Sequence, residues 1–251
     1  MNEREYEQMF KVEDRHWWYA SLHELILEFV AKEQQSGRTL RILDAGCGTG
    51  RLCQLLEKFG EVEGCDLSQQ AIAFSRARGL TAVSCADLNH ADLGEERYDV
   101  VTSIDVLYHR AVADDAEILA KFYRALKPGG LLILNLPAYE FLRSTHDIAV
   151  HTRKRYTRKE LLPLLAEEGF CVERSTYRLG FLFIPIAFCR LAKRFLPRSP
   201  EAEEVASDVG LSTASVNSLL LSLVRAENLL LKRYSMPIGT SLFVTARRPL
   251  S

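Results

Sequence analysis

Short apolar runs alternate with amphipathic stretches along the first half of the chain. The runs with the length and composition of buried strands are 40–44, 61–66, 81–85, 98–104 and 131–136. The stretches between them place apolar residues at helical spacing, over 50–59, 69–78 and 113–126. Strands that alternate with helices in this order predict right-handed crossovers and a parallel sheet.

The two ends of the chain extend this pattern. Apolar residues recur at helical spacing from Trp18 to Phe29, which predicts a helical N-terminal segment. After the fifth strand we expect a helix over 158–168, strands over 171–177 and 239–248, and a mostly helical stretch between those strands. The predicted organisation is an N-terminal helical lid, an α/β core, a helical insertion and a final strand, over 1–37, 38–178, 179–238 and 239–251.

Composition narrows the classes of protein to consider. The 32 basic residues nearly balance the 33 acidic ones, which does not favour a nucleic-acid partner. The 6 cysteines form no CxxC pair or zinc-like spacing with histidine, so no metal site is expected and a reducing compartment is favoured. The N-terminus is polar, unlike a secretory signal, and no apolar run is long enough to span a membrane. We therefore expect a soluble cytoplasmic protein.

A glycine-rich turn follows the first predicted strand and opens a helix. Gly46, Gly48 and Gly50 allow a tight turn and close approach of a ligand to the backbone. Asp66 ends the second strand, about 20 residues further on, where a carboxylate accepts hydrogen bonds from ribose hydroxyls. These features fit any cofactor that contains adenosine.

The acid before the turn separates the candidate cofactors. Asp44 lies two residues before Gly46 in a D-x-G-x-G-x-G pattern, whereas dinucleotide-binding proteins favour G-x-G-x-x-G. A carboxylate is a poor neighbour for a pyrophosphate and a good one for an ammonium group. Together with Asp87 after the third strand, this pattern indicates a cofactor that carries an amino acid and argues against a nicotinamide-dependent oxidoreductase.

Several segments carry a family resemblance. LDAGCGTG, over 43–50, resembles the first motif of class I methyltransferases, which use S-adenosylmethionine (SAM). The segment 66–68 resembles the acidic ribose-binding position, 86–88 the segment beside the adenine, and 126–132 the turn into the fifth strand. HWWY, over 16–19, is similar to a bacterial subgroup of that family, whose members carry this segment before the first motif.

The resemblance implies an α/β fold, the Rossmann-like class I methyltransferase fold. This fold has a seven-stranded, mostly parallel sheet with helices on both faces, here with a helical insertion between the last two strands. The implied activity is SAM-dependent methyl transfer, and the expected cofactor ligands are Trp18, Tyr19, Asp44, Gly46, Cys47, Gly48, Gly50, Asp66, Leu67, Asp87, Leu88 and Asp105. The aromatic HWWY residues are expected either to form a lid over SAM or the acceptor, or to anchor their helix to the core.

Histidines near the predicted carboxyl edge of the sheet are candidates for a general base. His109 follows the fourth strand, and His146 and His151 follow the fifth; each has a structural hydrogen-bonding role as its alternative. The candidate acceptor-binding residues are Tyr139, Arg153, Arg155 and Tyr156. The basic residues among them either meet a phosphate or carboxylate of the acceptor, or form the solvated start of the next helix. Relatives tend to carry arginines where this chain has Leu22 and His23, and a glutamate where it has Tyr108, so no acceptor contact is carried over at these positions.

The inserted segment leaves three interpretations open. Residues 179–196 are strongly apolar, with basic residues at 178, 190, 193, 194 and 198. This composition suits an interfacial helix near anionic lipid, the lining of a pocket for a lipid-linked acceptor, or a helix packed on the core or in a dimer interface. Residues 203–230 superficially resemble a helix-turn-helix, but they carry too few basic residues for DNA binding. We therefore expect these helices to cover the active site.

The expected acceptor is a small molecule, or an intermediate linked to a lipid or a sugar, methylated on oxygen or nitrogen. The alternatives are a SAM-binding protein without turnover and a nucleic-acid-directed methyltransferase or regulator that uses 203–230. No nucleic-acid partner is expected, and the chain is expected to act as a monomer or a homodimer. Peripheral contact with the inner face of the membrane through 179–196 is the remaining partner hypothesis.

Overall fold

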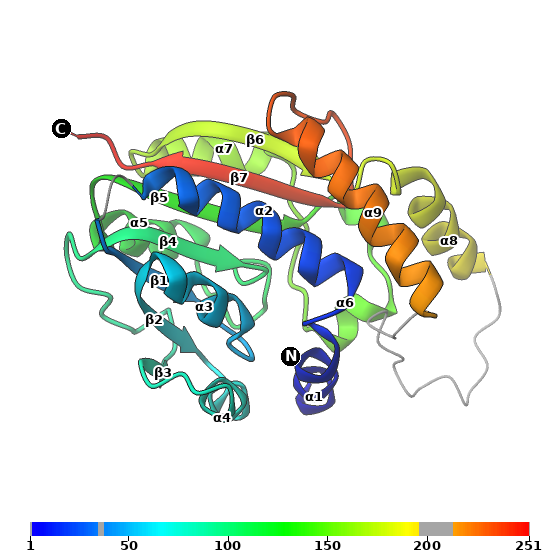
Figure 1. Ribbon diagram of the computed structural model, residues 1–251. Helices are drawn as coiled ribbons and strands as arrows, with labels where there is room; N and C mark the ends of the chain where they lie inside the picture. The colour runs from blue at the N-terminus through cyan, green and yellow to red at the C-terminus, as the bar shows by residue number, and fades with distance from the viewer. Residues whose placement is uncertain (1, 35–37, 196–212, 251) are drawn as a thin grey trace.

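A seven-stranded sheet forms the centre of the computed structural model, which describes residues 2–34, 38–195 and 213–250 (Figure 1). The strand order is β3-β2-β1-β4-β5-β7-β6. The strands are β1 (Leu40–Ala45), β2 (Gly60–Asp66), β3 (Val83–Cys85), β4 (Tyr98–Ile104), β5 (Leu126–Pro137), β6 (Cys171–Arg178) and β7 (Ser241–Arg247). Only the pairings of β7, with β5 and with β6, are antiparallel among the described strands. The predicted Rossmann-like sheet of class I methyltransferases is thereby confirmed.

Helices cover both faces of the sheet, as predicted. They are α1 (Glu3–Val12), α2 (Trp17–Glu33), α3 (Arg51–Leu56), α4 (Gln69–Ala77), α5 (Asp115–Ala125), α6 (Thr145–Ala149), α7 (Arg158–Glu167), α8 (Phe183–Phe195) and α9 (Ala214–Leu231), with 3-10 turns η1 (Glu57–Phe59) and η2 (Glu140–Leu142). On one face, Leu25 of α2 belongs to the same buried cluster as Ile42 of β1. On the other face, Leu119 of α5 and Leu165 of α7 share a cluster with Val101 of β4. Two apolar layers therefore enclose the sheet.

The N-terminal segment is two helices rather than one continuous helix. The break is at His16, whose backbone is extended and whose Nδ1 accepts a hydrogen bond from the Trp18 N–H at 3.3 Å. A side-chain acceptor at this position satisfies one of the free N–H groups at the start of α2. The cap turns the chain between the helices, so α1 lies apart from α2, near α4 and α6 (Figure 1).

The insertion between β6 and β7 contributes α8 and α9. α9 lies along α2, and the Asn228 amide donates to the Ser21 carbonyl at 2.7 Å (Figure 1). Both oxygens of the buried Glu227 carboxylate accept backbone N–H groups at the β6–α8 connection, those of Leu179 at 2.6 Å and Phe181 at 3.0 Å. These bonds fix the position at which the insertion leaves the sheet.

The described part of 203–230 forms one continuous helix rather than a helix-turn-helix. Residues 203–212 lie outside the described residues, and 214–231 form α9 without an internal turn. Across the ranges that the structure describes, no helix is both long and apolar enough to cross a bilayer.

Candidate active site

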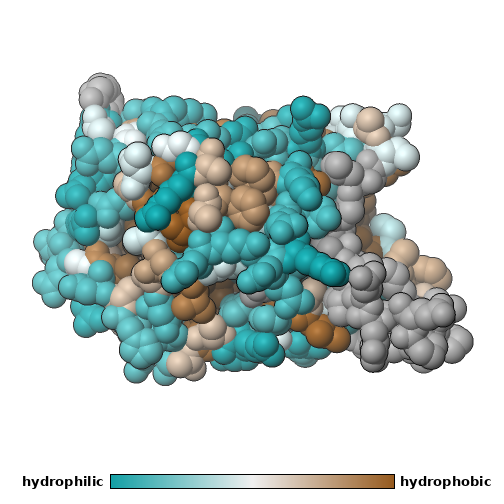
Figure 2. All heavy atoms as spheres, turned by 90° about the horizontal axis from the view of Figure 1, so that it is seen from below, coloured by the Kyte–Doolittle hydropathy of each residue, from teal (hydrophilic) through white to brown (hydrophobic). Residues whose placement is uncertain are grey.

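A cavity of about 900 Å³ opens at the edge of the sheet where β1, β2 and β4 end. Its wall combines the glycine-rich turn after β1, helices α1 and α2, the segment after β5, and parts of α8 and α9. Figure 2 looks at the face that carries α1 and α4, and it shows apolar side chains set among hydrophilic ones. Ligands of doubly wound sheets bind at this carboxyl edge, because the loops there diverge around a crevice.

The glycine-rich turn is held open by its backbone conformation. Gly46, Gly48 and Gly50 have φ values of 91°, 53° and 83°, which L-residues with a side chain rarely adopt. The Gly46 N–H donates to the carbonyl of Cys65 at 2.7 Å, and the Gly48 N–H donates to the Asp66 carboxylate at 3.0 Å. The turn is thus tied to the end of β2 by its own N–H groups.

Acidic side chains line the half of the cavity nearest this turn. They are Glu5, Glu13, Asp44, Asp66 and Asp87. Burial raises the pKa of Asp44 to about 6, although its carboxylate accepts hydrogen bonds from Thr102 at 2.7 Å and Cys53 at 3.4 Å. Burial also raises the pKa of Asp66, against the hydrogen bonds that it accepts from Ser68 and Gly48. This half suits a ligand that carries positive charge, as the sulfonium and ammonium groups of SAM do.

Helix α1 lies across this acidic half. The Tyr6 hydroxyl donates to Asp66 Oδ1 at 3.3 Å, and Met9 Cε lies 2.7 Å from the position that a Cβ on Gly48 would take. Glu13 pairs with Arg78 at 2.7 Å and accepts a short hydrogen bond from Thr49. The arrangement makes α1 a cover over the carboxylate that was predicted to bind ribose.

The positions of the HWWY residues agree with both roles that the sequence left open. Trp17, Trp18 and Tyr19 all line the cavity. Trp18 also packs against the buried cluster beneath α2, and its ring meets that of Tyr19 edge-on at 4.9 Å. Their position supports both the lid and the anchor interpretation.

The other half of the cavity is mostly apolar. Its apolar wall consists of Val150, Leu179, Leu182, Pro185, Ile186, Cys189 and Leu220. Its polar groups are His146, Asp147, His151, Arg155, Arg190, Thr240 and Ser241. A pocket with an apolar body and a few placed polar groups is typical of a site for a small organic molecule.

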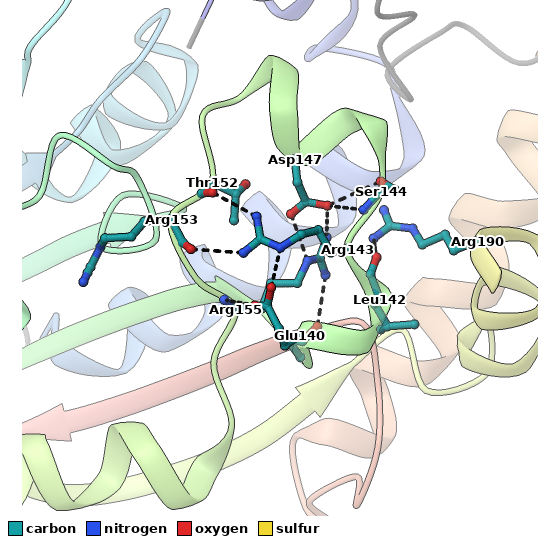
Figure 3. Close-up of polar contacts among 10 residues, drawn as sticks. Glu140, Leu142, Arg143, Ser144, Asp147, Thr152, Arg153, Arg155 and Arg190 are labelled. Carbon is teal, nitrogen blue, oxygen red and sulfur yellow. Dashed lines mark hydrogen bonds and ion pairs between the residues drawn. The ribbon is translucent and has the colours of Figure 1, made fainter. Parts of the chain in front are cut away.

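An ion-pair network holds the segment after β5 in place (Figure 3). Arg155 donates to both oxygens of Asp147, at 2.9 and 3.0 Å, and both side chains are buried. Arg143 bridges to the carbonyls of Thr152 and Arg153 at 3.0 Å each (Figure 3). Arg190 of α8 donates to the Leu142 carbonyl at 2.8 Å, which joins the insertion to this segment.

Most of the predicted site residues meet at this cavity. The three candidate histidines, Arg155 and every predicted cofactor ligand except Gly50 line it. His109 and His151 face one another, with ring centroids 5.6 Å apart. Their roles stay predictions.

Gly50 and three of the four predicted acceptor contacts lie outside the cavity wall. Arg153 forms an ion pair with Asp115, and the buried Tyr156 hydroxyl donates to the Leu107 carbonyl at 3.0 Å. The Tyr139 ring stacks on that of Tyr177 at 4.9 Å. These contacts give the three side chains structural partners, and their roles in acceptor binding stay predictions.

Several cavity residues carried no signal in the sequence. Tyr6, Met9 and Glu13 come from a helix without a motif, and Thr240 and Ser241 come from the chain's far end. Others lay in or beside a motif and could have been suspected, namely His16, His23, Ser68, Ala86 and Asn89.

Comparison with known proteins identifies the family. A family model described as a methyltransferase domain matches residues 43–134. A ubiquinone biosynthesis O-methyltransferase of Alkalilimnicola ehrlichii is 32% identical over 194 residues, which are 66% of this chain and 77% of that protein. The chain belongs to the class I SAM-dependent methyltransferases. The predicted family, with SAM as its methyl donor, is confirmed.

Other relatives of this methyltransferase are similar over shorter stretches. A ubiquinone biosynthesis O-methyltransferase of Hydrogenovibrio crunogenus is 37% identical over 131 residues, which are 45% of this chain and 52% of that protein. The chain therefore matches about half the length of that relative. A SAM-dependent methyltransferase structure from Mesorhizobium loti has a TM-score of 0.56 at 20% identity, covers 89% of this chain and 98% of that one, and shows the shared fold.

We expect Asp66→Ala to weaken SAM binding by roughly 10- to 100-fold, because a hydrogen bond to a charged group contributes about 1.5–3 kcal/mol. The variant also removes the acceptor of the Gly48 N–H, which shapes the turn. Isothermal calorimetry with SAM measures the change. Asp92→Ala is the control, because Asp92 is an exposed carboxylate that accepts only the Gly94 N–H among the described residues. Equal affinity in the two variants would contradict the assignment of Asp66.

Proposed function

We propose that this methyltransferase transfers the methyl group of SAM to an oxygen or nitrogen of a small molecule with a largely apolar body. The observation that carries the proposal is the continuity of the cavity, from the acidic half beside Gly46 to the apolar wall of α8. One half suits a cationic cofactor, and the other accommodates an apolar molecule that must meet the methyl group. The relatives named as ubiquinone biosynthesis O-methyltransferases support an acceptor of this class.

Methyl transfer requires the protein mainly to align the acceptor with SAM. The methyl carbon of SAM is already activated by the sulfonium, so the acceptor must be held in line with the carbon–sulfur bond and shielded from water. Trp18 and Tyr19 narrow the cavity from α2, and Leu182, just before α8, and Ile186 of α8 close it from the other side. We propose that these four side chains exclude water from the reacting atoms.

Purified protein incubated with methyl-tritiated SAM and a bacterial lysate tests the proposal. Label is then divided between an organic extract, small aqueous solutes and precipitated macromolecules. We expect label in the organic extract for an apolar acceptor. Label among the aqueous solutes would keep the methyltransferase activity and reject the apolar acceptor. Binding of SAM without transfer of label to any fraction would favour a SAM-binding protein without turnover.

The nucleic-acid alternative receives no support from the described residues. α9 has one basic side chain, Arg225, and its guanidinium is paired with Glu24 of α2 at 2.5 Å. Label in precipitated nucleic acid in the same experiment would revive this alternative.

We also propose that α8 contacts an anionic membrane surface. Fewer basic residues support this contact than the sequence suggested. Ile184 and Phe188 on the outer side of α8 are 75% and 72% exposed, which supports an apolar contact. Two of the basic residues counted near this helix turn inward: Arg178 is fully buried, and Arg190 binds the Leu142 carbonyl. Co-sedimentation with anionic vesicles that Phe188→Ser reduces would support the contact, and its absence in the unchanged protein would reject it.

A further inference from the structure

Asp105 lies where the two halves of the cavity meet. β4 ends at Ile104, and Asp105 follows with φ of 55°, a conformation that Asp tolerates better than most residues. The next residue, Val106, packs on the glycine-rich turn, with its Cγ2 2.1 Å from the position that a Cβ on Gly46 would occupy. The turn that carries Asp105 therefore packs on the glycine-rich turn, and Asp105 lines the cavity.

The Asp105 carboxylate is held by a neutral group. The Asn135 amide Nδ2 lies 3.2 Å from each of its oxygens, and the Asp105 N–H donates to the Asn135 carbonyl at 2.8 Å. Within the described ranges Asp105 forms no ion pair, whereas Asp147 is paired with Arg155, and Glu13 with Arg78. An ionised carboxylate accepts several hydrogen bonds, so one amide leaves lone pairs of Asp105 open to the cavity.

The positive charges that act on Asp105 are those of Arg155, in the cavity wall, and Arg178, which is buried behind it. Burial raises the pKa of Asp105 to about 7, and the Asn135 amide and the charges of Arg178 and Arg155 oppose this rise. The phenols of Tyr19 and Tyr108 are its other titratable neighbours, and both remain protonated because burial raises their pKa values. Asp44, by contrast, lies close enough to another carboxylate, Asp66, for their charges to repel. Asp105 thus differs from Asp44 of the acidic half in that its charged neighbours are arginines rather than another carboxylate.

Arg178 supplies a buried charge beside this carboxylate. Its side chain is fully buried, and its Nη2 donates only a long hydrogen bond, at 3.4 Å, to Ser21 Oγ. Nε and Nη1 have no hydrogen-bond partner among the described residues. Its charge is felt by Glu227 and Asp105. A buried guanidinium without a bonded acid acts on Asp105 through its field, and that field favours the ionised carboxylate.

We propose that Asp105 is the general base of methyl transfer, and that Asn135 and Arg178 are its positioning residues; this inference rests on the proposed function. The acceptor O–H or N–H proton passes to the Asp105 carboxylate as the acceptor lone pair forms its bond to the methyl carbon. The carbon–sulfur bond breaks, and its electron pair stays on sulfur, which leaves neutral S-adenosylhomocysteine. The proton then leaves Asp105 for solvent.

His109, which also follows β4, is a weaker base than Asp105. His109 Nδ1 accepts the Ala111 N–H at 3.1 Å, so the neutral ring carries its proton on Nε2. Burial lowers the pKa of His109 to about 4, which keeps the ring neutral near pH 7. Such a ring donates a hydrogen bond from Nε2 and therefore suits acceptor binding better than proton abstraction.

The test compares Asp105→Asn with the unchanged protein and with Asp92→Asn, a variant of an exposed carboxylate outside the cavity. SAM affinity is measured by calorimetry. Transfer from methyl-tritiated SAM to a bacterial lysate is measured from pH 5.5 to 9. We expect Asp105→Asn to bind SAM within about threefold of the unchanged protein and to transfer label about 100-fold more slowly or worse, the range of general-base contributions.

In the unchanged protein the rate is expected to rise with pH through a midpoint near 7, because only the ionised carboxylate accepts a proton. Arg178→Met should move this midpoint upward, and Arg178→Lys should restore it, a readout that a purely structural arginine would not give. Weak SAM binding by Asp105→Asn would make Asp105 a cofactor ligand and overturn the inference, as would an unchanged transfer rate. Absence of transfer by the unchanged protein would instead reject the proposed function, and the inference with it.

Discussion

Gly46→Ala is expected to weaken SAM binding strongly, with an affinity about 100-fold lower than that of the unchanged protein. The φ of Gly46 is 91°, and a Cβ at this position would lie 2.1 Å from Val106 Cγ2. The turn must shift to relieve this overlap, and overpacking of this kind costs about 1–3 kcal/mol, which corresponds to as much as about 100-fold in affinity. Calorimetry with SAM measures the change.

Gly79→Ala is the control that distinguishes steric overlap with Val106 from backbone strain at a positive φ. Gly79 has φ of 92°, and a Cβ there would meet nothing within 4 Å. Both substitutions therefore impose the left-handed conformation on alanine, at about 1–2 kcal/mol, but only Gly46→Ala disturbs the cavity. We expect Gly79→Ala to lower stability slightly and to bind SAM normally. Equal SAM binding by the two variants would contradict the role of the Gly46–Val106 contact.

Asp147→Ala is expected to lower the free energy of unfolding by about 3–5 kcal/mol, because it leaves the buried Arg155 guanidinium without its bonded acid. The substitution also removes the acceptor of the Ser144 N–H at the start of α6. Urea unfolding measures the loss. Glu24→Gln is the control: it breaks an exposed ion pair with Arg225 and should cost less than about 1 kcal/mol.

The same ion pair predicts the direction of a pH effect. Burial raises the pKa of Asp147, but its hydrogen bonds and ion pair with Arg155 outweigh burial and hold the pKa below its usual value. A lowered carboxyl pKa contributes stability above the pKa of the unfolded chain, and this contribution is lost as pH falls through the folded-state pKa. Acid should therefore narrow the difference between the unchanged protein and Asp147→Ala. A difference that stays constant into acid would contradict this assignment.

The sequence determined the features that depend on local pattern. Alternating apolar runs and helical spacing gave the order of strands and helices, because burial on a sheet or along a helix imposes these periods wherever the chain folds. The turn from Asp44 to Gly50 and the acid at Asp66 located the acidic half of the cavity, where we propose that SAM binds, because a tight turn beside a ligand requires glycine at fixed positions. The position of the break between α1 and α2 was missed, since it depends on how one side chain, His16, caps the next helix.

Only the tertiary structure showed which residues form the mostly apolar half of the cavity. Ile186 of α8, Leu220 of α9 and Ser241 of β7 line one cavity, although they are far apart along the chain. Arg153 and Arg155 look alike in sequence, yet the first pairs with Asp115 away from the cavity and the second with Asp147 in its wall. A local pattern records which residues an element buries. It does not record which distant side chain that element contacts. Those long-range contacts decide whether a residue lines the cavity or forms a structural ion pair elsewhere.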